Sequence, residues 1–238
     1  MQPPDTLPPS WQRLLALSGV AFAVLFVVGW FASGGDAPDY AAVDQEWTEW
    51  ADDNQWKSRI GAFAMLLAGF VFLHFLGTIR SVLGTAETTV RGSAQLARVA
   101  FGGALIGIAG MTTAIVMVSA ATSEGADVNP VVSRAVATSL AGPFLLSAMG
   151  FAALLAAAGL LTLRSGVFAR WVGIVALLGA ISFLITFLTL IAGTGEDSVF
   201  GFGFFPGVLA LVIWSIATSI ARYRAVATRD LLANEAGT

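Results

Sequence analysis

The stretch Ile60–Ile79, IGAFAMLLAGFVFLHFLGTI, decides the fold of this 238-residue chain. It contains one ionisable side chain, His74, and it lies between Arg59 and Arg80. A helix of about twenty residues, rising about 1.5 Å per residue, crosses the roughly 30 Å hydrocarbon core of a bilayer. The stretch therefore predicts a transmembrane helix.

The composition of the whole chain agrees with this prediction. Hydrophobic residues make up 57% of the sequence and charged residues only 11%, against roughly 25% charged residues in a soluble domain. We therefore expect one domain, residues 1–238, with no separate soluble part. The chain has no cysteine, which excludes disulfides, thiol catalysis and thiolate metal sites. Its basic residues are too few and too scattered for nucleic-acid binding.

Apolar stretches recur along the chain, and each is long enough for a span. We expect an all-α membrane protein, a bundle of six transmembrane helices. The predicted spans are residues 13–31, 60–79, 99–121, 135–163, 171–192 and 204–221. The fourth is longer than a helix normal to the membrane needs, so we expect it to tilt or to bend near Pro143.

The distribution of basic residues predicts the orientation. On the side that carries both termini, the sequence places nine arginines: Arg13, Arg80, Arg91, Arg98, Arg164, Arg170, Arg222, Arg224 and Arg229. The other side has three basic residues, Lys57, Arg59 and Arg134. The positive-inside rule then places both termini in the cytoplasm. Because arginine far outnumbers lysine, we expect a GC-rich bacterial genome and hence the bacterial inner membrane.

The predicted outer loop, residues 32–58, is the most distinctive polar segment. Val43, Trp47 and Trp50 follow one another at helical spacing, which predicts a short amphipathic helix on the outer surface with its tryptophans toward lipid or the bundle mouth. Its acidic residues are Asp44, Glu46, Glu49, Asp52 and Asp53. A solvated acidic cap is the favoured interpretation. A divalent-cation site is the alternative, although the segment lacks the acid and glycine spacing of a calcium loop.

His74 is the one histidine, and it lies roughly 9 Å from Arg80 along a helix. An ionisable group at this depth is a candidate for proton transfer, ligand contact or metal or haem ligation. The structural alternative is a neutral imidazole that is hydrogen-bonded to a neighbouring helix. A pocket joining His74 to Arg80 or Arg98 and a second acid–base group would instead favour an enzyme.

Gly103 and Gly107 form a small-xxx-small pair in the third span. Small residues at this spacing let another helix approach closely in a membrane. We expect an intramolecular packing face here rather than a dimer interface.

The connection between the fourth and fifth spans reads LRSGVFARWVG, residues 163–173. Its Gly166, Arg170 and Gly173 resemble the inner turn of an actinobacterial-type family of six-helix membrane proteins, a domain of unknown function. The sequence departs from that pattern at Ala169, where the family often has proline. The resemblance implies the six-helix fold and brings no activity with it.

Three functions remain open from the sequence. The first is a non-enzymatic membrane protein that binds a lipid-like or apolar ligand between its helices, or that scaffolds a complex with a partner subunit. The second is a small transporter or channel with a path near the third to fifth spans and His74. The third is a membrane enzyme of unknown type. No catalytic residue set, cofactor or metal is predicted.

Overall fold

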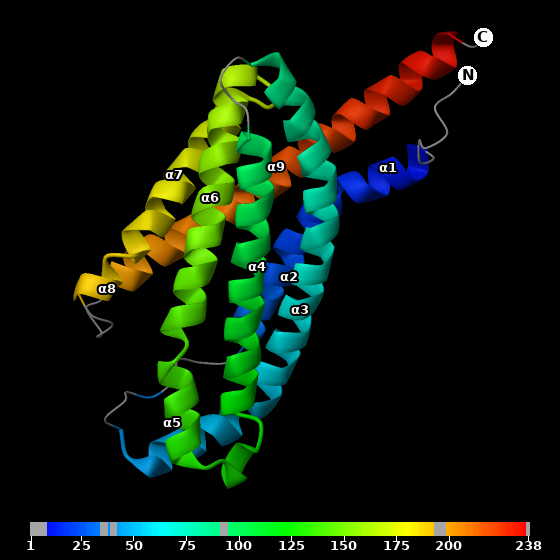
Figure 1. Cartoon of the computed structure of the whole chain (residues 1–238). Helices are drawn as coiled ribbons and strands as arrows, with labels where there is room; N and C mark the ends of the chain where they lie inside the picture. Colours follow the sequence, from blue (N-terminus) through cyan, green and yellow to red (C-terminus); the bar gives the residue numbers. More distant parts are fainter. Residues whose placement is uncertain (1–8, 34–37, 39–41, 91–94, 193–198, 237–238) are drawn as a thin grey trace.

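The structure, a computed structural model, describes residues 9–33, 38, 42–90, 95–192 and 199–236. The regular elements among these residues are all helices. The longest, α3 (Asp44–Thr89), has 46 residues, or about 69 Å at about 1.5 Å per residue. Figure 1 shows its first turns lying across one end of the bundle and the rest running to the opposite end.

The outer helix predicted within residues 32–58 is therefore not a separate element. It is the first part of α3 and runs without interruption into the predicted second span. The physical reason lies in the sequence, because no proline or glycine stands between Asp44 and Ile60 to end the helix.

Six helices form a closed ring around a common core. They are α2 (Ser18–Ala32), α3, α4 (Leu96–Ala121), α6 (Ala141–Ser165), α7 (Arg170–Thr186) and α9 (Val199–Ala236). In that order each packs against the next, and α9 returns to pack against α2. Beyond the ring, α9 continues next to α1 (Pro9–Ala16), and Figure 1 shows both extending past one side of the bundle.

Aromatic rings fill the middle of this bundle. Phe72 of α3 lies 4.4 Å from Phe22 and 6.1 Å from Phe151, measured between ring centroids. Phe183 of α7 continues the cluster from Phe151 to Phe204 at 5.9 Å each. All five side chains are fully buried. The core therefore links α2, α3, α6, α7 and α9 through ring contacts, which add to the stabilisation from burial.

Helix α4 packs against α6 through its glycines. A Cβ built on Gly103 would lie 2.6 Å from the carbonyl oxygen of Gly150 in α6, and one on Gly107 would lie 2.5 Å from the ring of Phe151. A Cβ on Gly110 would meet the Ser147 nitrogen at 2.6 Å. Since only hydrogen fits at these positions, the α4 and α6 backbones are in close contact within the chain.

Five helical segments are long and apolar enough to cross a membrane: residues 44–89, 96–121, 130–165, 170–191 and 202–228. Each overlaps one predicted span. The first predicted span, residues 13–31, is divided between α1 and α2, and α2 has only 15 residues. At about 1.5 Å per residue it is shorter than the roughly 30 Å core, so the sixth span stays a prediction.

The division of the first span has a local cause. Leu17 lies between α1 and α2 and is followed by the pair Ser18–Gly19. The Ser18 hydroxyl donates a hydrogen bond of 2.6 Å to the Leu15 carbonyl. Serine and glycine pairs are a recognised cause of helix kinks, and this one interrupts the apolar run.

The fourth predicted span also has a break, slightly before the expected position. Helix α5 (Pro130–Thr138) ends ahead of Ser139, and α6 begins at Ala141. The proline ring of Pro143 clashes with a helical carbonyl four residues earlier, which is that of Ser139. Proline therefore breaks the helix one turn ahead of itself. The fifth span has a similar break, at Phe187–Leu188, before α8 (Thr189–Ala192).

Large apolar side chains also cover the outside of the ring. Among the exposed ones are Phe63, Phe70, Ile174, Leu178, Ile181, Leu184 and Leu209, each between 45% and 69% accessible. A soluble monomer rarely exposes apolar surface on this scale. The apolar exterior and the long apolar helices together indicate an integral membrane protein.

Candidate functional site

The two ends of the bundle carry opposite charge. The acidic end is defined by Asp44, Glu46, Glu49, Asp52, Asp53, Glu124 and Asp127, near the start of α3. The basic end is defined by Arg80, Arg98, Arg164, Arg170, Arg222 and Arg224, near the α6–α7 turn. Figure 1 places the start of α3 with α5 at one end of the bundle and the α6–α7 turn at the other.

Contacts across the acidic end hold it together. Arg134 of α5 donates hydrogen bonds to the Ala42 carbonyl (2.8 Å) and to the Asp44 carboxylate (2.9 Å). Its guanidinium carbon lies 5.8 Å from the centre of the buried Trp47 ring. The other predicted tryptophan, Trp50, is half-buried and lies 5.8 Å from Trp47. One arginine thus fastens α5 to the start of α3.

Further hydrogen bonds attach the start of α3 to the end of α4. Gln55 and Arg59 both donate to the Ser123 carbonyl, at 2.9 and 2.6 Å. Ser133 of α5 donates to the carbonyl of Ala121, the last residue of α4, at 2.8 Å, so α5 is attached to the same place. Among the described residues, no three histidine or acidic side chains gather closely enough to hold a metal ion. This geometry supports a structural cap; a cation site there stays a prediction.

The structure does not bring His74 and Arg80 together. They are six residues apart on α3 and therefore point roughly 120° apart around the helix axis. His74 is exposed, and its Nδ1 lies 3.1 Å from the Phe70 carbonyl of the same helix rather than near a neighbouring helix. The Arg80 guanidinium lies over the Phe101 ring, 4.9 Å from its centre. Neither arrangement forms an acid–base pocket.

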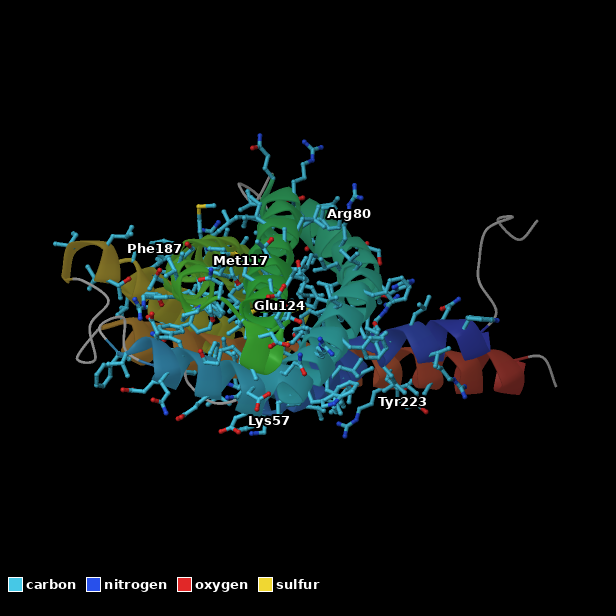
Figure 2. The ribbon with its side chains drawn as sticks, turned by 90° about the horizontal axis from the view of Figure 1, so that it is seen from below. Lys57, Arg80, Met117, Glu124, Phe187 and Tyr223 are labelled. Carbon is cyan, nitrogen blue, oxygen red and sulfur yellow. The ribbon has the colours of Figure 1, made fainter. Side chains whose placement is uncertain are left out.

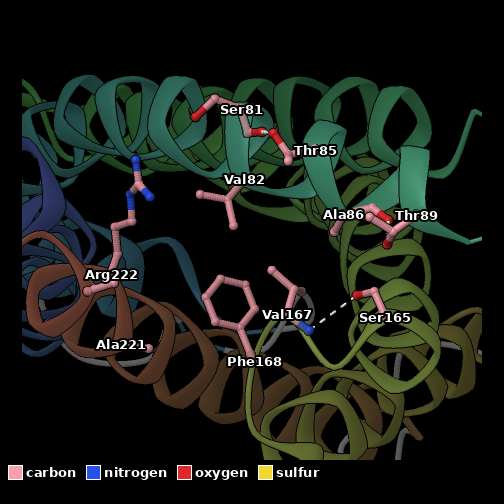
Figure 3. Close-up of a pocket in the computed structure, with 11 residues that line it drawn as sticks. Ser81, Val82, Thr85, Ala86, Thr89, Ser165, Val167, Phe168, Ala221 and Arg222 are labelled. Carbon is pink, nitrogen blue, oxygen red and sulfur yellow. Dashed lines mark hydrogen bonds between the residues drawn. The ribbon is translucent and has the colours of Figure 1, made fainter. Parts of the chain in front are cut away.

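A cavity of about 500 Å³ opens at the basic end instead. It lies between the last part of α3, the α6–α7 turn and α9, as Figure 3 shows. Its polar lining residues are Ser81, Thr85, Thr89, Ser165 and Arg222, and its apolar ones are Val82, Ala86, Val167, Phe168, Ala221 and Ala225. We name it the α3–α9 cavity.

One wall is a row of hydroxyls. Ser81, Thr85 and Thr89 follow at intervals of four, so they lie on one face of α3. Each donates to a carbonyl of its own helix, at 2.8, 3.0 and 2.7 Å. Since each hydroxyl hydrogen is used within the helix, the oxygen faces the cavity as an acceptor.

The α6–α7 turn forms the floor. Gly166 adopts φ +68°, a left-handed conformation that suits glycine at the end of a helix. The Ser165 hydroxyl accepts a hydrogen bond of 3.2 Å from the Val167 nitrogen, which shapes the turn and leaves Phe168 buried beside the cavity. At Gly173, a Cβ would lie 2.9 Å from Leu163, so the two helices approach closely after the turn.

Arg222 supplies the positive charge of the cavity. It is half-buried on α9, and Figure 3 shows its side chain extending from α9 toward α3, across the space from Phe168. Figure 2, a view along the bundle, shows Arg80 near the outer edge of the bundle, where its side chain is exposed. Among the arginines whose side chains the structure describes at this end, Arg222 alone lines the cavity.

Two further hollows adjoin the α3–α9 cavity. One, of about 380 Å³, is a groove between α7 and α9 lined by Trp171, Val172, Ile213, Ile216, Ile220 and other apolar residues, with Arg224 at its end. It shares Ala221 with the cavity. The other, of about 370 Å³, contains Arg170 and shares Phe168. We name the first the α7–α9 groove.

Sequence reasoning missed the α3–α9 cavity. The four-residue spacing of Ser81, Thr85 and Thr89 was a signal for a polar face beyond the second span. No sequence pattern indicated that Arg222 lines a cavity, because arginines at the ends of membrane spans usually lie at the membrane–water interface.

No family model, curated protein or solved structure matches the chain. The resemblance of the α6–α7 turn to a six-helix family therefore stays a prediction. The fold and its apolar exterior define the class: an all-helical, integral membrane protein.

Proposed function

We propose that this protein binds a lipid-like ligand between its helices, in the α3–α9 cavity, and acts by binding rather than by catalysis. The observation that carries the proposal is the mixed lining of this cavity. Arg222 of α9 and the row of hydroxyls on the facing α3 are polar, whereas Val167 and Phe168 of the floor and most of the adjoining groove are apolar. An amphiphile, with one polar end and one apolar end, matches such a lining.

The core favours binding over conduction. Phe72, Phe151 and Phe183 occupy the centre of the ring of helices and are fully buried. A water-filled path between the two ends would have to displace these rings. His74, which a transport path was expected to use, points to the outside of the bundle.

Native mass spectrometry of the protein, gently extracted from its own membrane, tests the proposal. We expect a defined adduct of lipid mass. Ala225 lines the cavity and is exposed, so Ala225→Trp should fill the space without disturbing the core, and the adduct should disappear. Thr228→Trp, three residues further along α9 and outside the lining, is the matched control. An adduct that survives Ala225→Trp would refute the proposed site.

We also propose that the protein lies in the bacterial inner membrane with its basic end and both termini in the cytoplasm. The charge difference between the ends supports this orientation. Since the chain has no cysteine, single cysteines at Trp11, Asp53 and Ala169 give clean labelling sites. An impermeant thiol reagent should label whole cells at position 53 only. Labelling at position 11 as well would mean that residues 13–31 do not span.

A further inference from the structure

We infer that the ligand is an anionic phospholipid whose head group carries hydroxyls, with its phosphate at Arg222 and an acyl chain in the α7–α9 groove. This inference rests on the proposed function and narrows it to one class of lipid. It draws on the charge of the cavity, the direction of its hydroxyl hydrogen bonds and the position of the groove.

Arg222 provides the charge that an anionic head group would bind. A guanidinium presents five donors in a planar fork that matches a phosphate, and it keeps its charge at any physiological pH. Arg170 and Arg224 line the two adjoining hollows. Glu87, a carboxylate at the same end, accepts a hydrogen bond of 3.2 Å from the Ala97 nitrogen. Basic pockets between helices on the cytoplasmic side are suited to anionic head groups.

The hydroxyl row selects among anionic head groups. The oxygens of Ser81, Thr85 and Thr89 face the cavity as acceptors, because their hydrogens are donated to α3 carbonyls. A head group with free hydroxyls can donate to them while its phosphate binds Arg222. A bare phosphate offers few donors, and a choline head group offers none.

The α7–α9 groove provides the place for the chain. It meets the cavity at Ala221 and then follows Ile220, Ile216 and Ile213 away from the basic end, toward the middle of the membrane. Trp171 and Arg224 also line the groove, and residues of these types are common at the membrane interface. A lipid with its phosphate at Arg222 has its glycerol next to Ala221 and its chain along the isoleucines.

The test uses purified protein in detergent with two probes of identical chains, palmitoyl-oleoyl phosphatidylglycerol and palmitoyl-oleoyl phosphatidylcholine. Titration by native mass spectrometry should give phosphatidylglycerol about tenfold tighter binding, the effect of one or two hydrogen bonds. Both lipids carry the phosphate, but only phosphatidylglycerol has a net negative charge and head-group hydroxyls that can donate to the hydroxyl row. Arg222→Gln should weaken the binding of both lipids, because both carry the phosphate, and should lower the preference because a positive charge is lost, whereas Arg222→Lys should retain part of both effects. Unchanged affinity of Arg222→Gln for both lipids would overturn the placement of the phosphate at Arg222. Arg98→Gln is the matched control, since Arg98 is exposed on α4 at the same end and does not line the cavity.

If Arg222→Gln does not fold, as judged by helical circular dichroism, the exposed Arg170 provides a second variant. Arg170→Gln should reduce the preference by about fivefold, the effect of one surface arginine on an anionic lipid.

The remaining outcomes separate this inference from the proposed function. Equal binding of both lipids, lost in Ala225→Trp, would overturn the head-group assignment and leave the cavity as a lipid site. Binding of neither lipid would overturn both. Competition by millimolar inorganic phosphate, with equal loss of both lipids, would assign the site to a free anion and overturn the lipid as its occupant.

Discussion

The close contact between α4 and α6 makes opposite predictions for two adjacent glycines. A Cβ on Gly103 would lie 2.6 Å from the Gly150 oxygen and 2.8 Å from the Leu154 nitrogen, whereas a Cβ on Gly102 meets nothing within 4 Å. Ordinary van der Waals contact begins at 3.4 Å, so the new Cβ of Gly103→Ala would lie about 0.8 Å too close to the Gly150 oxygen. Backbone atoms, unlike a flexible side chain, cannot rotate away. The two helices must separate by a comparable distance.

The magnitude follows from that separation. A gap of about 0.5–1 Å forfeits a quarter to a half of each dispersion contact, and in lipid such packing is a main source of helix association. Overpacking of this kind costs about 1–3 kcal/mol. Gly102→Ala has no such cost and gains up to about 1 kcal/mol from helix propensity. We therefore expect the free energy of unfolding to fall for Gly103→Ala and to stay level or rise for Gly102→Ala.

The assay is unfolding of the detergent-solubilised protein by sodium dodecyl sulfate, followed by circular dichroism. Gly150→Ala should resemble Gly103→Ala, because its Cβ would meet the Gly103 oxygen at 2.5 Å. The double variant should be less destabilised than the two single effects added, since the first substitution already separates the helices. A shift of the same sign and size for Gly102→Ala and Gly103→Ala would refute the close-contact argument.

Three further substitutions, two of them paired with a control, have defined expectations in the same assay. Gly166→Ala should destabilise by about 1–2 kcal/mol because of its left-handed φ, whereas Gly77→Ala, with open space at its Cβ, should not. Arg134→Gln should cost about 1–2 kcal/mol and expose the start of α3 to protease, whereas Asp44→Asn, at a carboxylate that is 64% exposed, should change little. His74→Gln should leave the midpoint unchanged; a large loss would place the imidazole in an interaction that its exposed position does not explain.

The sequence by itself determined the membrane class and the approximate place of five long apolar helices. Their length and hydropathy are properties of contiguous residues, and a bilayer imposes internal backbone hydrogen bonding on any segment that crosses it. The five acidic residues near the start of α3, Asp44, Glu46, Glu49, Asp52 and Asp53, and the glycine of the α6–α7 turn were also readable, because charge and left-handed φ are local properties. The pair Gly103 and Gly107 indicated close helix packing but did not identify the partner helix.

Only the tertiary structure decided which faces meet. His74 was a candidate from its depth in a span, but depth along a helix does not fix its rotation, and packing turned the imidazole outward. Arg222 was one of nine basic residues on its side, and the crossing of α9 past α3 and the α6–α7 turn placed it on a cavity wall. The site joins residues 81–89, 165–168 and 221–225, which are distant in sequence. Their convergence depends on the ring of helices closing, and no contiguous segment contains that information.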